Sequence, residues 1–177
     1  KARELTGEGQ YIEHAQVESS LHFLAPLLLD ARLTGRIATR RGNHEDHLAP
    51  NNTYRALDGD WLALSIATDE QWQALTRILG AGHLSQDGRF GGYEARKANE
   101  DALDAALDLE ISRHSARELV TKLQGAGIPA SLVAKASDLY EDPQLAHRRT
   151  FVRVAHPELG EHGVQRQAFI ISGIGAG

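Results

Sequence analysis

The chain has no cysteine and no methionine among its 177 residues. Without cysteine it can form no disulfide and offers no thiol nucleophile or thiolate metal ligand. It also lacks any apolar run near the roughly 20 residues that a membrane-spanning helix needs. The longest such run, residues 23–29, contains Pro26 and ends at Asp30. The N-terminus carries no secretory signal pattern. We therefore expect a cytoplasmic protein without a membrane partner.

An excess of basic residues is missing as well. Lysine and arginine number 19 against 24 aspartates and glutamates, which gives a net charge of −5. Nucleic-acid-binding proteins usually carry a basic surface, so we expect no nucleic-acid partner. The hydrophobic content of 41% and charged content of 24% are ordinary for a globular chain. The length suits one domain, or a small domain joined to a piece of another.

The first predicted element is a long helix near the N-terminus. Its apolar residues recur with the 3.6-residue period of a helix. They are Val17, Leu21, Leu24, Leu28 and Ala31. Pro26 should kink this helix because proline lacks the backbone donor, and Gly35 should end it. Residues 35–52 are polar and follow neither period, which predicts a linker loop.

A small set of strands and helices is predicted after the linker. A β-hairpin is expected over 53–57 and 61–66, with Gly59 in its turn. Capping boxes at Thr68 and Ser115 predict two helix starts. Further expected elements are helices over 94–109 and from Asp142, and strands over 130–133, 151–155 and 165–171. The predicted core residues are Trp61, Trp72, Leu75, Ile78, Leu79, Ala95, Ala98, Ala102, Ala106, Leu109, Leu119, Val120 and Leu123. This pattern predicts an α+β fold.

The stretch from Arg40 to Leu64 carries the most informative order of residues. A polar loop with Gly42 and Asn43 ends in Ala49-Pro50, and Tyr54 and Asp58-Gly59-Asp60-Trp61 follow. The other motifs, in order, are Thr6-Gly7-Glu8-Gly9-Gln10, Asp87-Gly88-Arg89-Phe90 with Arg96 and Asn99, Gly127-Ile128-Pro129-Ala130, Asp142-Pro143-Gln144 and His156-Pro157-Glu158-Leu159-Gly160. Together they resemble the family III CoA-transferases of the CaiB/BaiF type. That group includes formyl-CoA transferase and α-methylacyl-CoA racemase.

The resemblance implies an organisation in three parts. Residues 1–52 correspond to the terminal helix of a truncated large domain and its linker loop. Residues 53–155 correspond to a small domain of short strands packed with helices, and residues 156–177 to a segment returning toward the large domain. On this interpretation the chain is the C-terminal, small-domain portion of a longer protein. The family also implies an interlocked homodimer.

The resemblance further implies a covalent transfer of CoA between carboxylic acids. In the family an aspartate attacks an acyl-CoA thioester and passes through an anhydride to an aspartyl-CoA thioester. That aspartate lies upstream of the segment that begins here at Thr6, and no aspartate precedes Thr6. We therefore expect no catalytic nucleophile in this chain and no transferase activity of the chain alone. Coenzyme A is a substrate, and no other cofactor is expected.

The candidate substrate residues lie in the loop before the hairpin. In the family this loop is rich in glycine and closes over the reacting groups, which excludes water. Here His44-Glu45-Asp46-His47 replaces the glycines, and the candidates for substrate contact are Asn43, His44 and His47. The alternative is that both histidines are solvated loop residues. The spacing His44-x-x-His47 also allows a metal interpretation, but three or four converging ligands are needed, so no metal site is predicted.

Three other functions remain open at this stage. The chain could belong to a 2-methylacyl-CoA racemase, the family's other chemistry. It could be a non-enzymatic interaction module, which binds a partner through the apolar face of Val17, Leu21 and Leu24. It could also be one subunit of a split enzyme whose partner supplies the aspartate.

Overall fold

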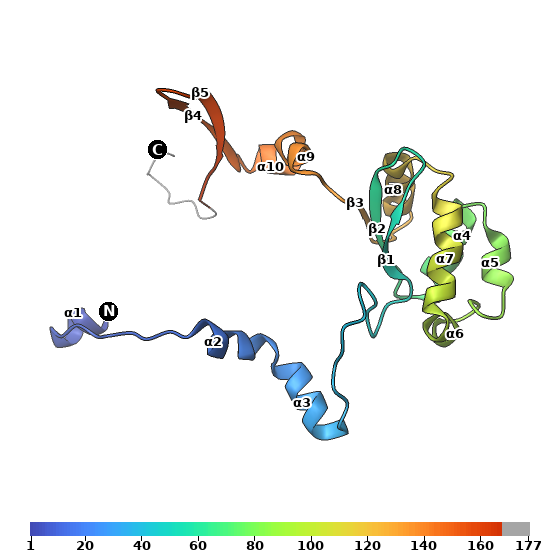
Figure 1. The fold of residues 1–177 in the computed structure, drawn as a ribbon, viewed down its shortest axis with the longest axis horizontal. Helices are drawn as coiled ribbons and strands as arrows, with labels where there is room; N and C mark the ends of the chain where they lie inside the picture. The colour runs from blue at the N-terminus through green and yellow to red at the C-terminus, as the bar shows by residue number, and fades with distance from the viewer. Residues whose placement is uncertain (168–177) are drawn as a thin grey trace. The chain divides into compact units, whose positions relative to one another are not determined.

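The computed structural model describes residues 1–167 (Figure 1). The chain divides into two compact units, one comprising residues 1–42 and the other beginning at Asn43. Each unit is described by itself below. The division of the parent protein after residues 52 and 155 stays a prediction.

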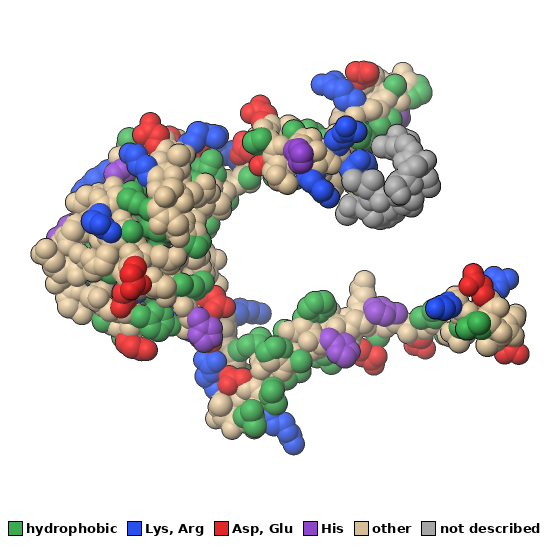
Figure 2. All heavy atoms as spheres, turned by 180° about the vertical axis from the view of Figure 1, so that it is seen from behind, with side chains coloured by type: hydrophobic (Ala, Val, Ile, Leu, Met, Phe, Trp, Pro, Cys, Tyr) green, Lys and Arg blue, Asp and Glu red, His purple; other side chains and the backbone are tan. Residues whose placement is uncertain are grey.

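The first unit consists of short helices without a core. Helix α1 spans Ala2–Thr6, α2 spans Gln16–Phe23 and α3 spans Ala25–Thr34. The kink expected from Pro26 is a full break at Leu24, because the proline occupies the first turn of α3. Gly35 ends α3 with a left-handed φ of 75°. None of the three helices contains a buried residue, and Figure 2 shows hydrophobic side chains along their surface.

The second unit is built on a three-stranded antiparallel sheet. Strands β1 (Asn51–Arg55), β2 (Trp61–Ser65) and β3 (Ala130–Leu132) lie in the order β1-β2-β3. Alternation along the strands puts Tyr54, Leu62 and Leu64 on the buried face. The assignment of Trp61 to the core is wrong: its side chain is 46% exposed, because it belongs to the opposite set of the alternation.

Five helices lie between β2 and β3 in the sequence, and the last two of them pack against this sheet. The five are α4 (Asp69–Ile78), α5 (Gly82–Gln86), α6 (Tyr93–Ala98), α7 (Glu100–Ile111) and α8 (Ala116–Gly125). The predicted core residues Trp72, Leu75, Leu79, Leu119, Val120 and Leu123 are all buried. They pack with the strand residues and with α7 in one hydrophobic cluster. Within residues 1–167 no helix is long and apolar enough to cross a membrane.

The helix predicted over residues 94–109 is two helices instead. Asn99 separates α6 from α7 and has a non-helical φ of −125° and ψ of 32°. The break changes which residues of α7 face the core. Leu103, Leu107 and Ile111 are buried at successive turns, whereas Leu109 is 67% exposed. The alanines assigned to the core in this region are at most partly buried.

The two predicted capping boxes have different outcomes. Thr68 accepts a hydrogen bond from the backbone N–H of Gln71 at 3.3 Å, and so caps α4 as expected. Ser115 makes no such bond at the start of α8. There the backbone N–H of Ala116 donates to the Asp58 carboxylate at 3.0 Å, so the hairpin turn caps the helix.

The last described elements follow β3. Helices α9 (Ala136–Glu141) and α10 (Pro143–His147) precede the antiparallel hairpin of β4 (Phe151–His156) and β5 (Gly160–Gln165). Asp142 caps α10 as expected, and the side chains of Tyr140 and Phe151 stack with ring centroids 4.2 Å apart. The strand predicted over 165–171 is wrong in its bounds, because the observed strand β5 ends at Gln165 and residues 166–167 are not in a strand. Residues 168–171 of that prediction lie outside the described part.

Candidate functional site

The loop of residues 43–50 leads directly into β1, and its exposure alternates along the chain. The side chains of Asn43, Glu45 and His47 are exposed, whereas His44, Asp46 and Leu48 are partly buried. A single bridge between the backbones of Glu45 and Leu48 closes the tip of the loop. The loop therefore turns one set of side chains toward the folded unit and the other toward solvent.

Asn43 is held by the first residues of β1. Its side-chain amide donates to the Oδ1 of Asn52 at 2.8 Å, and its backbone carbonyl accepts from the Asn51 amide at 2.6 Å. Asn51 is itself hydrogen-bonded to the Ser65 hydroxyl of the neighbouring strand. The polar groups of Asn43 thus fix the start of the loop on the sheet.

His44 lies between two carboxylates of α7. Its Nε2 is 2.9 Å from the Oδ2 of Asp104, and its Nδ1 is 3.7 Å from Glu100. Glu100 and Asp104 are like charges four residues apart on one helix, a spacing that is unfavourable by itself. The ring of His44 separates them and faces one with each nitrogen.

Asp104 joins three side chains from different parts of the loop and strand. Besides His44, it accepts from the Asn52 amide at 2.6 Å and from the Tyr54 hydroxyl at 2.6 Å. Tyr54 is almost fully buried. Burial, reinforced by the nearby Asp104 charge, raises the pKa of the Tyr54 phenol well above its usual value. The phenol therefore remains a hydrogen-bond donor to Asp104 over the physiological pH range.

His47 differs from the other two candidates. Its side chain is exposed and has no hydrogen bond or ion pair within residues 1–167. Of the three predicted substrate residues, Asn43 is exposed but hydrogen-bonded to β1, His44 is partly buried against α7, and His47 is exposed without a partner in the described chain. Whether any of them touches a substrate stays a prediction.

Helix α6 contacts the backbone of the same loop. Tyr93 Oη donates to the carbonyl of Asp46 at 2.6 Å, and Arg96 Nε donates to the carbonyl of Ala49 at 2.9 Å. Lys97 Nζ donates to the carbonyl of Glu45.

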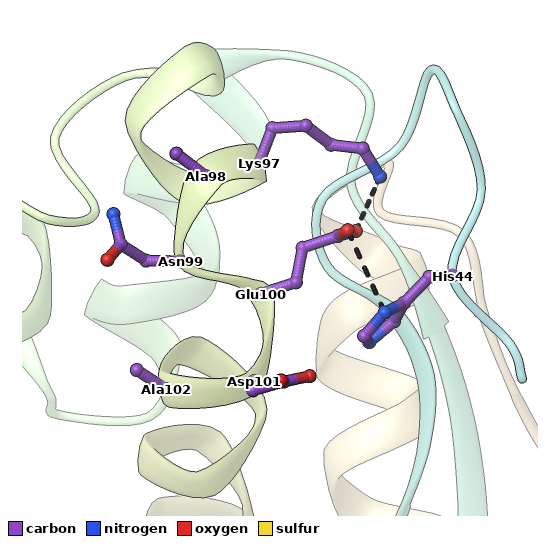
Figure 3. A pocket seen from close by; sticks show the side chains of 7 residues that line it. All are labelled: His44, Lys97, Ala98, Asn99, Glu100, Asp101 and Ala102. Carbon is purple, nitrogen blue, oxygen red and sulfur yellow. Dashed lines mark hydrogen bonds and ion pairs between the residues drawn. The ribbon is translucent and has the colours of Figure 1, made fainter. Parts of the chain in front are cut away.

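Lys97 also belongs to a shallow depression of about 440 Å³ at the junction of α6 and α7 (Figure 3). The ammonium of Lys97 is 2.5 Å from Glu100, and Glu100 in turn faces His44. Figure 3 shows these three side chains pointing toward one another. The depression is lined by His44, Lys97, Ala98, Asn99, Glu100, Asp101 and Ala102. In the described part of the chain no group of three or more histidine, aspartate or glutamate side chains is arranged to hold a metal ion.

Sequence reasoning named Arg96 and Asn99 only as motif residues and missed Tyr93, Lys97, Glu100 and Asp104 of this site. Lys97, Glu100 and Asp104 follow one another at helical spacing beside the apolar stripe of Leu103 and Leu107. A charged stripe that borders a core stripe is a usable signal for a polar network at the edge of the core. The predicted single helix over 94–109 obscured it, because that register assigned other residues to the buried face.

Comparison with known proteins gives a consistent result over nearly the whole chain. The profile of the family described as CoA-transferase family III matches residues 1–175. The succinyl-CoA–D-citramalate CoA-transferase of Chloroflexus aurantiacus is 28% identical over 163 residues, which is 92% of this chain and 40% of that protein. The acetyl-CoA:oxalate CoA-transferase of Acetobacter aceti is 31% identical over 152 residues, 86% of this chain and 39% of that protein.

Solved structures agree with the sequence comparison. The crystal structure of a CaiB/BaiF family protein from Brucella suis has a TM-score of 0.82 and 28% identity. The similarity covers 97% of this chain and 44% of that one. The chain thus spans about two fifths of the length of the curated relatives it matches.

Proposed function

The chain belongs to CoA-transferase family III, and from this premise we propose that it forms part of an enzyme that moves CoA between carboxylic acids. The observation that carries the proposal is the family match over residues 1–175. The two similar proteins described above are both named for CoA transfer, one from succinyl-CoA and one from acetyl-CoA. The fold and the order of motifs support the same assignment.

The proposed reaction proceeds through a carboxylate of the enzyme. An aspartate oxygen attacks the thioester carbonyl of the donor, the CoA thiolate leaves, and a mixed anhydride remains. The thiolate then attacks the aspartyl carbonyl, so that the donor acid departs and an aspartyl-CoA thioester forms. The acceptor carboxylate repeats both steps in reverse order, which regenerates the aspartate and gives the new acyl-CoA. We place this aspartate outside the 177 residues.

The contribution proposed for this chain is the loop of residues 43–50. The anhydride is easily hydrolysed, so the reaction needs a surface that keeps water away from it. The described loop is held on the sheet through Asn43 and on α7 through His44. A loop fixed in this way is suited to cover a reacting group without being rich in glycine.

The same proposal extends to cofactors and assembly. CoA enters as a substrate and no further cofactor takes part, since each step is a nucleophilic acyl transfer. The enzyme would act in the cytoplasm, where acyl-CoA substrates are available, and would assemble as a homodimer. Interlocking of the two chains is the arrangement expected from the family.

Thioester exchange tests the proposal directly. The 177-residue chain and the protein encoded by the longest reading frame that contains it are each incubated with succinyl-CoA, acetyl-CoA and a panel of free dicarboxylates. New acyl-CoA is measured by mass spectrometry. We expect exchange by the longer protein and none by the 177-residue chain. Peptide mapping of the trapped intermediate should place CoA on an aspartate outside these residues.

The result that would contradict the proposal is equally clear. If the longer protein exchanges no thioester with any acid of the panel, CoA transfer is not its activity. Exchange by the 177-residue chain alone would place the nucleophile inside it. Inversion of a 2-methylacyl-CoA centre without exchange would identify a racemase instead.

A further inference from the structure

Three neighbouring side chains of one short helix contact three backbone carbonyls of one loop. Tyr93, Arg96 and Lys97 of α6 donate to the carbonyls of Asp46, Ala49 and Glu45. We name these three residues the α6 clamp. The spacing of the donors matches one face of a helix, since residues three and four positions apart are neighbours there. The clamp thus reaches both the tip of the loop and the residue that precedes Pro50.

The members of the clamp are buried to different degrees. Arg96 is fully buried and also binds the Asp69 carboxylate at 2.8 Å, so its role includes the packing of the core. Tyr93 and Lys97 are partly buried at the edge. The bond from Tyr93 to Asp46 is partly buried and therefore costly to break, whereas the bond from Lys97 to Glu45 is exposed and gains strength from the charge of its donor. Tyr93 and Lys97 therefore restrict the loop without being part of the core.

The clamp decides which loop side chains face outward. With the carbonyls of Glu45 and Asp46 directed toward α6, His44 falls between Glu100 and Asp104. Of the two histidines, His44 is thus held by two carboxylates, whereas His47, beyond the tip, is exposed and has no partner in the described chain. An imidazole can donate to a carboxylate, the group that both acids of the proposed reaction carry.

We propose that Tyr93 and Lys97 are positioning residues, which fix the loop of residues 43–50 through its backbone so that His47 faces the carboxylate of the acid substrate. The inference rests on the proposed function for its substrate. Its structural half, the fixing of the loop, can be tested without any activity. Neither residue is a catalytic residue, because each acts through the loop.

Hydrogen exchange of the 177-residue chain tests the structural half. The variant Tyr93→Phe removes a single oxygen, and Lys97→Met removes the ammonium while keeping the stem. We expect the backbone N–H of Ala49, which donates to the Ile66 carbonyl at 3.0 Å, to exchange about fivefold faster or more, the change that follows the loss of one ordinary hydrogen bond. Tyr140→Phe and Lys122→Met are the matched controls, since neither polar group has a partner in the described chain. Unchanged protection of the loop in both test variants would overturn the inference.

Steady-state kinetics of the longer protein test the functional half. We expect Lys97→Met to lower kcat/KM for the acid by about tenfold at an unchanged melting temperature, and Lys97→Arg to restore most of it. The double variant His47→Ala with Lys97→Met should lower kcat/KM no more than His47→Ala alone, because both changes remove the same contact, that of His47 with the substrate carboxylate. Additive losses, or faster exchange with unchanged kinetics, would overturn the positioning role.

The hydrogen-exchange and kinetic experiments together distinguish failure of the inference from failure of the proposed function. If the unmodified longer protein transfers no CoA, the proposed function fails. The exchange of the loop amides then still decides whether α6 fixes the loop. If transfer is present but the loop amides are equally protected in every variant, the function stands and the clamp is rejected.

Discussion

At the scale of single residues, the guanidinium of Arg96 connects three segments that are distant in sequence. It donates to the carbonyls of Ala49 and Phe90 and to the Asp69 carboxylate, and it lies 5.3 Å from the ring centroid of Trp72. Its side chain is fully buried, whereas that of Asp69 is half exposed. The cost of burying the guanidinium is offset only while all these partners are present.

Replacement of Arg96 should therefore destabilise the second unit strongly. We expect Arg96→Met to lower the free energy of unfolding by about 2–4 kcal/mol, because buried carbonyls lose their donor. Urea denaturation followed by circular dichroism measures the change. Arg117→Met is the control, since Arg117 is exposed and should shift the midpoint little. Equal midpoints for the two variants would show that the Arg96 contacts add nothing to stability.

The phenol of Tyr54 allows a second prediction at this scale. Because burial and then the Asp104 charge raise its pKa, the phenol should stay protonated at a pH above the ordinary pKa of a tyrosine. The unfolded chain ionises Tyr54 at its ordinary pKa of 10.0. The stability due to this group is thus complete below that pH and is lost as pH rises toward the folded pKa.

Spectrophotometric titration of the phenols tests this prediction. Wild type should show one tyrosine that ionises late, and Tyr54→Phe should lack it. Asp104→Asn should lower the late pKa without returning it to the ordinary value, because burial is the larger cause. A single common transition for all tyrosines would contradict the arrangement around Asp104.

At the scale of elements, the start of α8 depends on a residue from the hairpin turn. The hydroxyl of Ser115 donates to the Asp58 carboxylate and lowers the pKa of Asp58, and the backbone N–H of Ala116 acts in the same direction. A carboxylate at a helix N-terminus also interacts favourably with the helix dipole. The turn between β1 and β2 and the first turn of α8 are therefore joined.

Loss of the Asp58 carboxylate should weaken the contact between the hairpin turn and the start of α8. We expect Asp58→Ala to lower the urea midpoint at neutral pH, and Asp58→Asn to lower it less, since an amide oxygen still accepts. The pKa of Asp58 is depressed in the folded protein, so its contribution is present above the ordinary pKa and is lost as pH falls through the folded one. The urea midpoints of the variants and of wild type should therefore differ less in acid than at neutral pH. Asp108→Ala, an exposed acid of α7 beyond its first turn, is the control.

Comparison of predicted and observed elements shows which signals are local. Gly59 takes a φ of 81° in the hairpin turn, and Thr68 and Asp142 cap their helices, as the sequence predicts. Each of these depends on neighbours within a few residues. Ser115 fails as a predicted cap, and the first backbone N–H of α8, that of Ala116, instead donates to Asp58, 58 residues away in the sequence. Local patterns contain no information on such a partner.

The same distinction applies to the candidate site. Asn43, His44 and His47 could be named from their place before the hairpin. Their environment could not, because His44 and Asp104 are 60 residues apart in the sequence. The break at Asn99 sets the register of α7 and thus decides which acid faces the loop. Tertiary packing fixes that register, so the roles of α6 and α7 emerge only from the structure.

At the scale of the whole molecule, the two units differ in how they treat apolar residues. The second unit holds the hydrophobic cluster, whereas the helices of residues 1–42 expose apolar side chains throughout. Val17 and Phe23 are 76% and 88% exposed. Exposed apolar surface of this extent favours association.

Self-association should therefore depend on the first unit. We expect the 177-residue chain to form concentration-dependent oligomers in analytical ultracentrifugation. The double variant Val17→Ser with Leu21→Ser should shift them toward monomer, because it removes apolar surface from α2. The matched control Leu109→Ser changes an equally exposed leucine of the second unit and should have no effect. If all three sediment alike, the α2 face does not drive association.

The α6 clamp holds the loop through carbonyl oxygens, and a carbonyl oxygen is the same for every residue type. The side chains of Glu45 and Asp46 can therefore be exchanged without removing the acceptors that Lys97 and Tyr93 use. The backbone path of such a loop does not depend on the identity of these side chains. Natural variation or laboratory selection can then alter what the loop presents to a substrate while its path across the protein is kept.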